Sequence, residues 1–190
     1  MNPKQLISDH FSASIKTMMG TGNTLDDRII QAALLTSETV TRGGKILSCG
    51  NGGSASDAQH FSSELVCRYE HNRKALAAVA LSSDASVITA TGNDYDFSQI
   101  FSRQVEALGR PGDLLLVIST SGESENVILA AEAALQMNIR VVGLTGKNGG
   151  TLGKLLEHDS LELRVPSEIV AHIQEAHAII IHCICKLVEL

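Results

Sequence analysis

The sequence predicts an α/β protein in which a five-stranded parallel sheet lies between layers of helices. Three observations support this fold class. Short runs of aliphatic and β-branched residues alternate with longer helical patterns, as in βαβ units. Most of these runs are apolar on both faces, which is typical of parallel strands covered on both sides. Only 3% of the residues are aromatic and Trp is absent, so Leu, Ile, Val and Ala must build the core, as they do in layered α/β folds.

Each element follows from these patterns. Two extra helices are predicted before the sheet, over residues 4–18 and 25–42, and Asp26 and Asp27 lie favourably near the start of the second one. Right-handed crossovers should connect the strands. Strands are predicted at residues 45–50, 77–82, 113–120, 140–146 and 161–166. Helices are predicted between them at residues 54–70, 97–108 and 123–137.

The last predicted helix, residues 168–189, carries apolar residues on more than one stripe. A surface helix of a single domain normally buries only one stripe. We therefore expect this helix and residues 1–42 to form a subunit interface in a closed homo-oligomer. A length of 190 residues favours one domain, spanning residues 1–190.

Composition excludes several classes of protein. The formal net charge is −6 and no cluster of Lys and Arg forms a basic patch, so we expect no direct binding of nucleic acid. No apolar run reaches membrane-spanning length, and the amino terminus lacks the apolar core of a signal peptide.

The cysteines indicate the redox compartment. Cys49 ends a predicted buried strand, and Cys183 and Cys185 point to different helix faces. Reduced, buried thiols are expected, and these fit a cytoplasmic protein.

Two loops at the carboxyl ends of predicted strands share one chemistry. Residues 51–54 (Asn-Gly-Gly-Ser) follow the first strand, and residues 119–124 (Ser-Thr-Ser-Gly-Glu-Ser) follow the third. Open parallel sheets bind ligands at this edge. Glycines let the backbone approach an anion, and the amides of the following helix attract phosphate. Helix capping explains one such loop equally well, but two loops favour an anion site.

A nucleotide fits these loops less well than a phosphorylated small molecule. Residues 50–55 match the G-x-G-x-x-A pattern of dinucleotide binding, which keeps a nucleotide-dependent oxidoreductase as an alternative. The acid that binds ribose should follow after about 20 residues, whereas Asp84 lies 34 residues beyond Gly50. Residues 145–150 are not a Walker loop, because Lys147 is followed by Asn148.

Groups suited to proton transfer occur on two predicted helices. His60 and Glu64 are four residues apart and share a helix face, about two turns below the proposed phosphate. Gln174 and His182 are eight residues apart on the last helix, so one cavity can receive both, although spacing alone does not choose His182 over His177. An exposed ion pair and buried, hydrogen-bonded histidines are the alternatives. Carboxylate with histidine, or either with a metal, suits proton transfer beside a carbonyl, and the four side chains suit Zn²⁺.

The ordered motifs CGNGGS, AQHFSSEL, TGNDYDF, ISTSGES and IQEAHAIIIH resemble the phosphoheptose isomerases of the sugar-isomerase (SIS) family. The resemblance covers nearly the whole chain and implies a flavodoxin-like three-layer sandwich. It also implies a sugar-phosphate site. The residues lining that site would be Asn51, Gly52, Gly53, Ser54, Glu64, Asn93, Asp94, Ser119, Thr120, Ser121, Ser124 and Gln174.

The same resemblance implies an activity and an assembly. Glu64 and His182 would be catalytic, and His60, Glu64, Gln174 and His182 would bind one zinc ion per subunit. The reaction would convert sedoheptulose 7-phosphate to D-glycero-D-manno-heptose 7-phosphate through an enediol, as the first step towards the ADP-heptose of lipopolysaccharide. Members of the family are cytoplasmic homotetramers whose sites are built across subunits.

A non-catalytic relative that binds the replication initiator DnaA is the main alternative implied by resemblance. That relative lacks the glutamate and the final histidine, whereas this chain keeps both Glu64 and His182. One departure from the family is His172, where relatives commonly carry Arg before the IQE motif. This difference at His172 bears on the detailed contacts with the substrate more than on the type of reaction.

Overall fold

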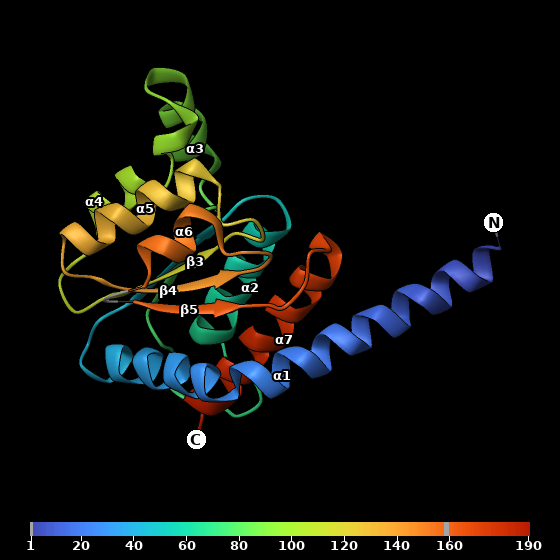
Figure 1. Cartoon of the computed structure of the whole chain (residues 1–190). Helices are drawn as coiled ribbons and strands as arrows, with labels where there is room; N and C mark the ends of the chain where they lie inside the picture. The colour runs from blue at the N-terminus through green and yellow to red at the C-terminus, as the bar shows by residue number, and fades with distance from the viewer. Residues whose placement is uncertain (1, 158–159) are drawn as a thin grey trace.

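The computed structural model describes residues 2–157 and 160–190 and contains one parallel sheet (Figure 1). The strand order is β2-β1-β3-β4-β5, the flavodoxin-like order in which the winding direction reverses between β1 and β3. The predicted five-stranded parallel sheet is therefore confirmed. The strands span Ile46–Gly50 (β1), Ala78–Ala80 (β2), Leu114–Ile118 (β3), Arg140–Thr145 (β4) and Leu161–Arg164 (β5).

Helices cover both faces of the sheet. On one face lie α1 (Pro3–Thr41), α2 (Gly53–Val66) and α7 (Val170–Val188). On the other lie α4 (Ser102–Leu108), α5 (Glu125–Gln136) and α6 (Gly150–Leu155). Helix α3 (Ala85–Asp94) and the 3₁₀ turn η1 (Phe97–Gln99) connect β2 to α4.

The central strand β3 shows why the sequence reads as apolar on both faces. Its five residues are all buried. Leu114, Leu116 and Ile118 pack into the core beneath α1, α2 and α7. Leu115 and Val117 point the other way, into the core beneath α4, α5 and α6. Successive side chains of a strand alternate between faces, so one run of apolar residues serves both cores.

The prediction of two amino-terminal helices was wrong. Residues 3–41 form one continuous helix, whose first half extends away from the sheet (Figure 1). Gly20 and Gly22 lie between the two predicted helices, and a glycine in a helix interior costs about 1 kcal/mol relative to alanine. Gly20 instead lies close to Pro166, where an added Cβ would be 3.8 Å from Cγ of the proline. Leu25 and Ile29 are buried further along the helix, so tertiary contacts carry α1 through the glycines.

Other boundaries differ because side-chain burial overrides the local pattern. The helix predicted over residues 97–108 is divided into η1 and α4, because Ile100 and Phe101 between them are almost fully buried. Helices α3 and α6 were not predicted. Asp84 caps α3 by accepting hydrogen bonds from the backbone N–H groups of Ser86 and Val87.

The apolar residues of α7 are covered largely within this chain. Helix α7 packs against α1, α2 and the sheet, so most of its apolar side chains are covered without a second subunit, and the subunit interface stays a prediction. Exposed apolar side chains gather instead on the first half of α1, at Ile7, Phe11, Ile15 and Met19. None of the helices in the described residues is long and apolar enough to cross a membrane.

Candidate functional site

The first loop joins β1 to α2 and is fixed to the neighbouring helix α5. Asn51 and Asn126 exchange hydrogen bonds between their amide groups, with N···O distances of 2.8 and 2.9 Å. Gly52 has φ +54° and lies directly before α2, in a backbone conformation that favours glycine. The start of α2 therefore lies at the carboxyl edge of the sheet, beside α5, and the N–H groups of Ser54 and Ala55 donate back to the carbonyl oxygens of Asn51 and Gly52.

Gly53, the first residue of α2, lies directly against the Gln174 side chain of α7. The amide of Gln174 lies so close that a Cβ at position 53 would overlap its Nε2 atom. Only glycine leaves room for the Gln174 side chain here. The predicted neighbours Gly53 and Gln174 are thus brought together, although they are far apart in the sequence.

The second loop follows β3 and leads into α5. The Ser119 hydroxyl donates to the Ser124 hydroxyl, at 3.2 Å, and accepts from the backbone N–H of Gly122, at 3.1 Å. Gly122 has φ +68°, and a side chain there would overlap the backbone of Gly149. Thr120 and Ser121 are half-buried at the same turn. These hydroxyls and the amino end of α5 give neutral and partly positive donors for an anion.

A cavity of about 310 Å³ lies between the two loops. Asn51 and Ser124 line it, as the sequence analysis predicts for a ligand site at this edge. The remaining lining residues were not predicted: Asp96, Phe97, Ser98, Glu125 and Asn126. Asn126 had one recognisable signal, because it lies in the first turn of the helix that follows the Ser-rich loop.

His60 and Glu64 of α2 lie next to His182 of α7. His60 Nε2 lies 3.2 Å from Glu64 Oε1. The rings of His60 and His182 are 5.0 Å apart between centroids, edge to face. Tyr69 stacks on the other side of His182, at 5.7 Å. His60 therefore connects Glu64 on one helix to His182 on the other.

The structure chooses between the two histidines that spacing left open. His177 is fully buried, and its Nε2 lies 2.9 Å from the carbonyl oxygen of Thr145. Burial lowers the pKa of His177 to about 4, so the ring stays neutral near pH 7. It faces the core, whereas the half-buried His182 faces His60.

Two predicted residues stand apart from this group. Asn93 and Asp94 end α3, are exposed, and hydrogen-bond to each other at 2.7 Å.

Two neighbours of His60 and His182 were not predicted: Tyr69 and Asp57. Asp57 lies one turn before His60 on α2, and burial raises the pKa of its carboxyl group while nearby His60 opposes the shift. No spacing signal identified either residue.

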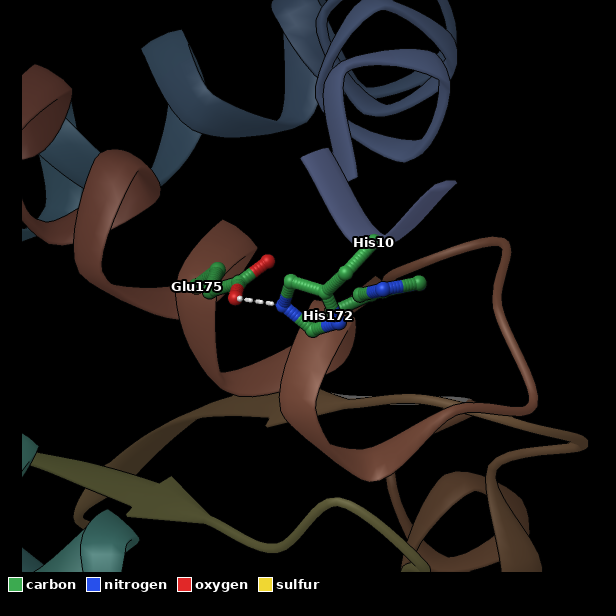
Figure 2. Close-up of side chains that lie close together, drawn as sticks. All are labelled: His10, His172 and Glu175. Atoms are coloured by element: carbon green, nitrogen blue, oxygen red, sulfur yellow. Dashed lines mark hydrogen bonds and ion pairs between the residues drawn. The ribbon is translucent and has the colours of Figure 1, made fainter. Parts of the chain in front are cut away.

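A second group of possible metal ligands joins α1 to α7 (Figure 2). His10, His172 and Glu175 each place a ligand atom within 4.8 Å of the others. The Ser14 hydroxyl donates to Glu175 at 2.5 Å. This bond is the largest of the influences that lower the pKa of Glu175, so the carboxylate stays ionised. Among the described residues this is the one such group of His, Cys, Asp and Glu.

Comparison with known proteins agrees with this architecture. A family model described as the SIS domain matches residues 10–146. A phosphoheptose isomerase of Shewanella sp. (strain ANA-3) is 52% identical over 183 residues, covering 96% of this chain and 93% of that protein. The solved phosphoheptose isomerase of Francisella tularensis is 46% identical, with a TM-score of 0.96 and coverage of 99% of this chain and 98% of that one. The enzyme of Neisseria gonorrhoeae is 44% identical, with a TM-score of 0.94 and 99% coverage of both chains.

Proposed function

This chain belongs to the SIS domain family, and from that premise we propose that it is a phosphoheptose isomerase. It interconverts sedoheptulose 7-phosphate and D-glycero-D-manno-heptose 7-phosphate, and so begins the route to ADP-heptose. The observation that carries the proposal is the contact of His60 with both Glu64 and His182, below two loops suited to phosphate. The isomerases that are about half identical to this chain support it, and they give no support to the DnaA-binding alternative.

The phosphate of the substrate binds at the carboxyl edge of the sheet. Ser119, Thr120, Ser121 and Ser124 donate hydroxyl hydrogen bonds there, and the start of α5 adds backbone N–H groups. Asn51, Gly52, Gly53 and Ser54 form the facing wall, at the start of α2. Gln174 reaches the sugar from α7. Asn93 and Asp94 complete the proposed set from the end of α3, directly before the turn whose Asp96, Phe97 and Ser98 line the cavity.

The reaction moves one proton between two adjacent carbons. Starting from the ketose, Glu64 removes a proton from C1 while His182 donates one to the oxygen on C2, which gives a cis-enediol. Glu64 then returns its proton to C2, and His182 recovers a proton from the oxygen on C1, which leaves the aldose. The exchanged assignment, with His182 acting on carbon and Glu64 on oxygen, balances equally well.

The proposed cofactor is one Zn²⁺ ion per subunit, held by His60, Glu64, Gln174 and His182. The donor set fits this ion, because Zn²⁺ accepts imidazole nitrogen, carboxylate oxygen and comparable neutral ligands at four positions. The proximity of His60 to both Glu64 and His182 supports the fit. The ring nitrogen of His182 that would hold zinc is not available for proton transfer. In the zinc-bound enzyme the ion would therefore polarise the substrate carbonyl and stabilise the enediolate oxygens in place of the acid–base role of His182.

We also propose that the protein assembles as a homotetramer with sites completed across subunits. Support comes from α1, whose first half exposes large apolar side chains that a monomer has no means to bury.

We also propose that the protein is located in the cytoplasm. All four cysteines are free thiols, and burial raises the pKa of Cys185 to about 12, so this thiol stays protonated and unreactive at neutral pH.

The test is the conversion of sedoheptulose 7-phosphate by the full-length protein and its Glu64→Gln and His182→Asn variants. We expect wild-type turnover and a fall of about 10² to 10⁴-fold in kcat for each variant, the range for loss of a general acid or base. Glu70→Gln, which changes an exposed carboxylate nearby, is the matched control and should keep wild-type activity. Absence of wild-type turnover, or full activity in both variants, would contradict the proposal. Capture of an initiator protein by an inactive wild type would support the adaptor instead.

A further inference from the structure

The His10–His172–Glu175 group lies outside the proposed catalytic set. His172 and Glu175 are three residues apart, so they share one face of α7. His10 reaches them from α1, 165 residues away from Glu175 in the sequence. Gln174, between them in the sequence, turns instead towards Gly53. The group faces α1 (Figure 2), whereas Gln174 of the proposed active site faces α2.

The three side chains already lie close to the arrangement that a metal ion needs. His10 Nε2 is 3.1 Å from Glu175 Oε1, the separation of two atoms that share one ion. The rings of His10 and His172 are 4.8 Å apart between centroids. The second oxygen of Glu175 accepts the hydroxyl hydrogen of Ser14. Such outer hydrogen bonds hold a ligating carboxylate in orientation.

His172 gives an independent reason to expect a ligand. Its side chain is 3% exposed, and its Nε2 has no hydrogen-bond partner among the described residues. A buried polar atom without a partner costs free energy, so natural structures nearly always supply one. The side chains of His10 and Glu175 are 49% and 38% exposed, which leaves an ion a path from solvent to the group.

We propose that His10, His172 and Glu175 form a second metal site that binds a divalent transition-metal ion, with Zn²⁺ as the expected occupant. Two imidazoles and one carboxylate are an established ligand set for Zn²⁺, with water in the fourth position. Co²⁺ accepts the same nitrogen and oxygen ligands and absorbs visible light, so it can serve as a spectroscopic substitute for Zn²⁺. The site needs no residue from the proposed catalytic set.

The ion fixes the first half of α1 to α7. In the described structure, His10 and Ser14 make the side-chain hydrogen bonds that join residues 2–17 of α1 to α7, both to Glu175. A bond from each helix to one ion replaces the exposed contact between His10 and Glu175 with a stronger link, while the Ser14 hydroxyl keeps its bond to Glu175. The site therefore stabilises the direction in which α1 leaves the body of the protein.

Zinc stoichiometry tests the proposal. Tag-free full-length protein, freed of metal with a chelator, is titrated with Zn²⁺ alone by calorimetry, and bound zinc is counted by elemental analysis. We expect His10→Ala to bind one equivalent fewer per chain than wild type. Asp9→Ala is the matched control, since it removes an exposed carboxylate one residue away, and it should bind as wild type does. His10 is an exposed helical residue, so its replacement should leave the fold intact.

The comparison is made again in a His60→Ala/His182→Asn background, which removes the other proposed site. In that background we expect one bound zinc ion per chain, and adding His10→Ala should remove it. The visible absorption of bound Co²⁺ should disappear in the same variant. Glu175→Gln, which keeps the size of the side chain, should give the same loss. Equal zinc binding by wild type and His10→Ala, or Co²⁺ spectra unchanged by His10→Ala in that background, would overturn the proposal. Both results are independent of isomerase activity.

Discussion

Gly53 of α2 lies directly against the Gln174 side chain of α7. The φ angle of Gly53 is not positive, so its backbone conformation does not require glycine. What position 53 requires is space, because any Cβ would overlap the amide of Gln174. The sequence analysis predicted Gly53 as a phosphate-loop glycine and Gln174 as a ligand, but their contact depends on how α2 packs against α7.

We expect Gly53→Ala to reduce isomerase activity without unfolding the protein. The new methyl group pushes aside the flexible end of Gln174, and a displacement of about 1 Å in a positioning group costs on the order of 100-fold in rate. Alanine is a good helix former, so the free energy of unfolding should change by less than about 1 kcal/mol. Steady-state kinetics and urea unfolding measure the two quantities. Gly92→Ala, where the nearest atom is 4.0 Å from the added Cβ, is the control, and equal activity of both variants would contradict this role of Gly53.

At the scale of elements, the carboxyl end of α7 holds the segment that follows α2. Glu189, whose side chain is 2% exposed, accepts hydrogen bonds from the backbone N–H groups of Tyr69, Glu70 and His71, each at 2.9 Å. Arg73 donates to it at 3.1 Å, and also caps α2 by donating to the carbonyl oxygen of Glu64. Tyr69, held by this clamp, stacks on His182.

This clamp predicts a defined dependence of stability on pH. Burial alone raises the pKa of Glu189, but the N–H donors of His71, Tyr69 and Glu70, with the charge of Arg73, outweigh it and lower the pKa from 4.5 to about 2. The unfolded chain therefore binds the proton more readily than the folded one. The resulting stabilisation is complete above pH 4.5 and is lost as pH falls towards 2.

We expect Glu189→Gln to lower the free energy of unfolding at pH 7 and to reduce its decline between pH 4.5 and 2. Urea unfolding of both proteins across this range measures the effect. Glu70→Gln removes a carboxylate of the same segment that is 45% exposed, and it should preserve the wild-type pH curve. Parallel curves for Glu189→Gln and wild type would show that Glu189 is not the group responsible.

Helix α1 also shows what local sequence determines about an element. The apolar pattern predicted helical structure on both sides of Gly20 and Gly22 correctly. It did not predict continuity, because the burial of Leu25 and Ile29 and the contact with Pro166 involve residues far apart in the chain. Intrinsic propensity is a small term that tertiary contacts override.

At the scale of the whole molecule, the free half of α1 is the principal exposed apolar surface on which assembly can depend. Ile7, Phe11 and Ile15 are four residues apart and lie on one helix face. They are 60%, 65% and 56% exposed. A stripe of this kind is stable in water only if another surface covers it.

We expect Phe11→Glu to convert the proposed tetramer into smaller species. A charge at the centre of the apolar stripe loses the hydrophobic contribution of a buried Phe, about 1.5 to 3 kcal/mol per interface, and adds the cost of burying a carboxylate. Light scattering coupled to size-exclusion chromatography measures the mass, and activity should fall with it because the sites are proposed to span subunits. Lys16→Glu, on the same half of α1, is the charge control. An unchanged mass for Phe11→Glu would contradict the proposed interface.

Local patterns in the sequence predicted the sheet and the two loops at its carboxyl edge, through alternation of apolar runs and through glycine and hydroxyl residues at strand ends. Spacing along a helix named His60, Glu64 and Gln174 as candidate groups, but left His182 and His177 as alternatives. Tertiary structure decided the choice of His182 over His177, the Asn51–Asn126 pairing, the clamp at Glu189 and the meeting of His10 with His172 and Glu175. Each of these depends on which helix faces meet, and that is set by the packing of side chains distant in sequence, which no local spacing records.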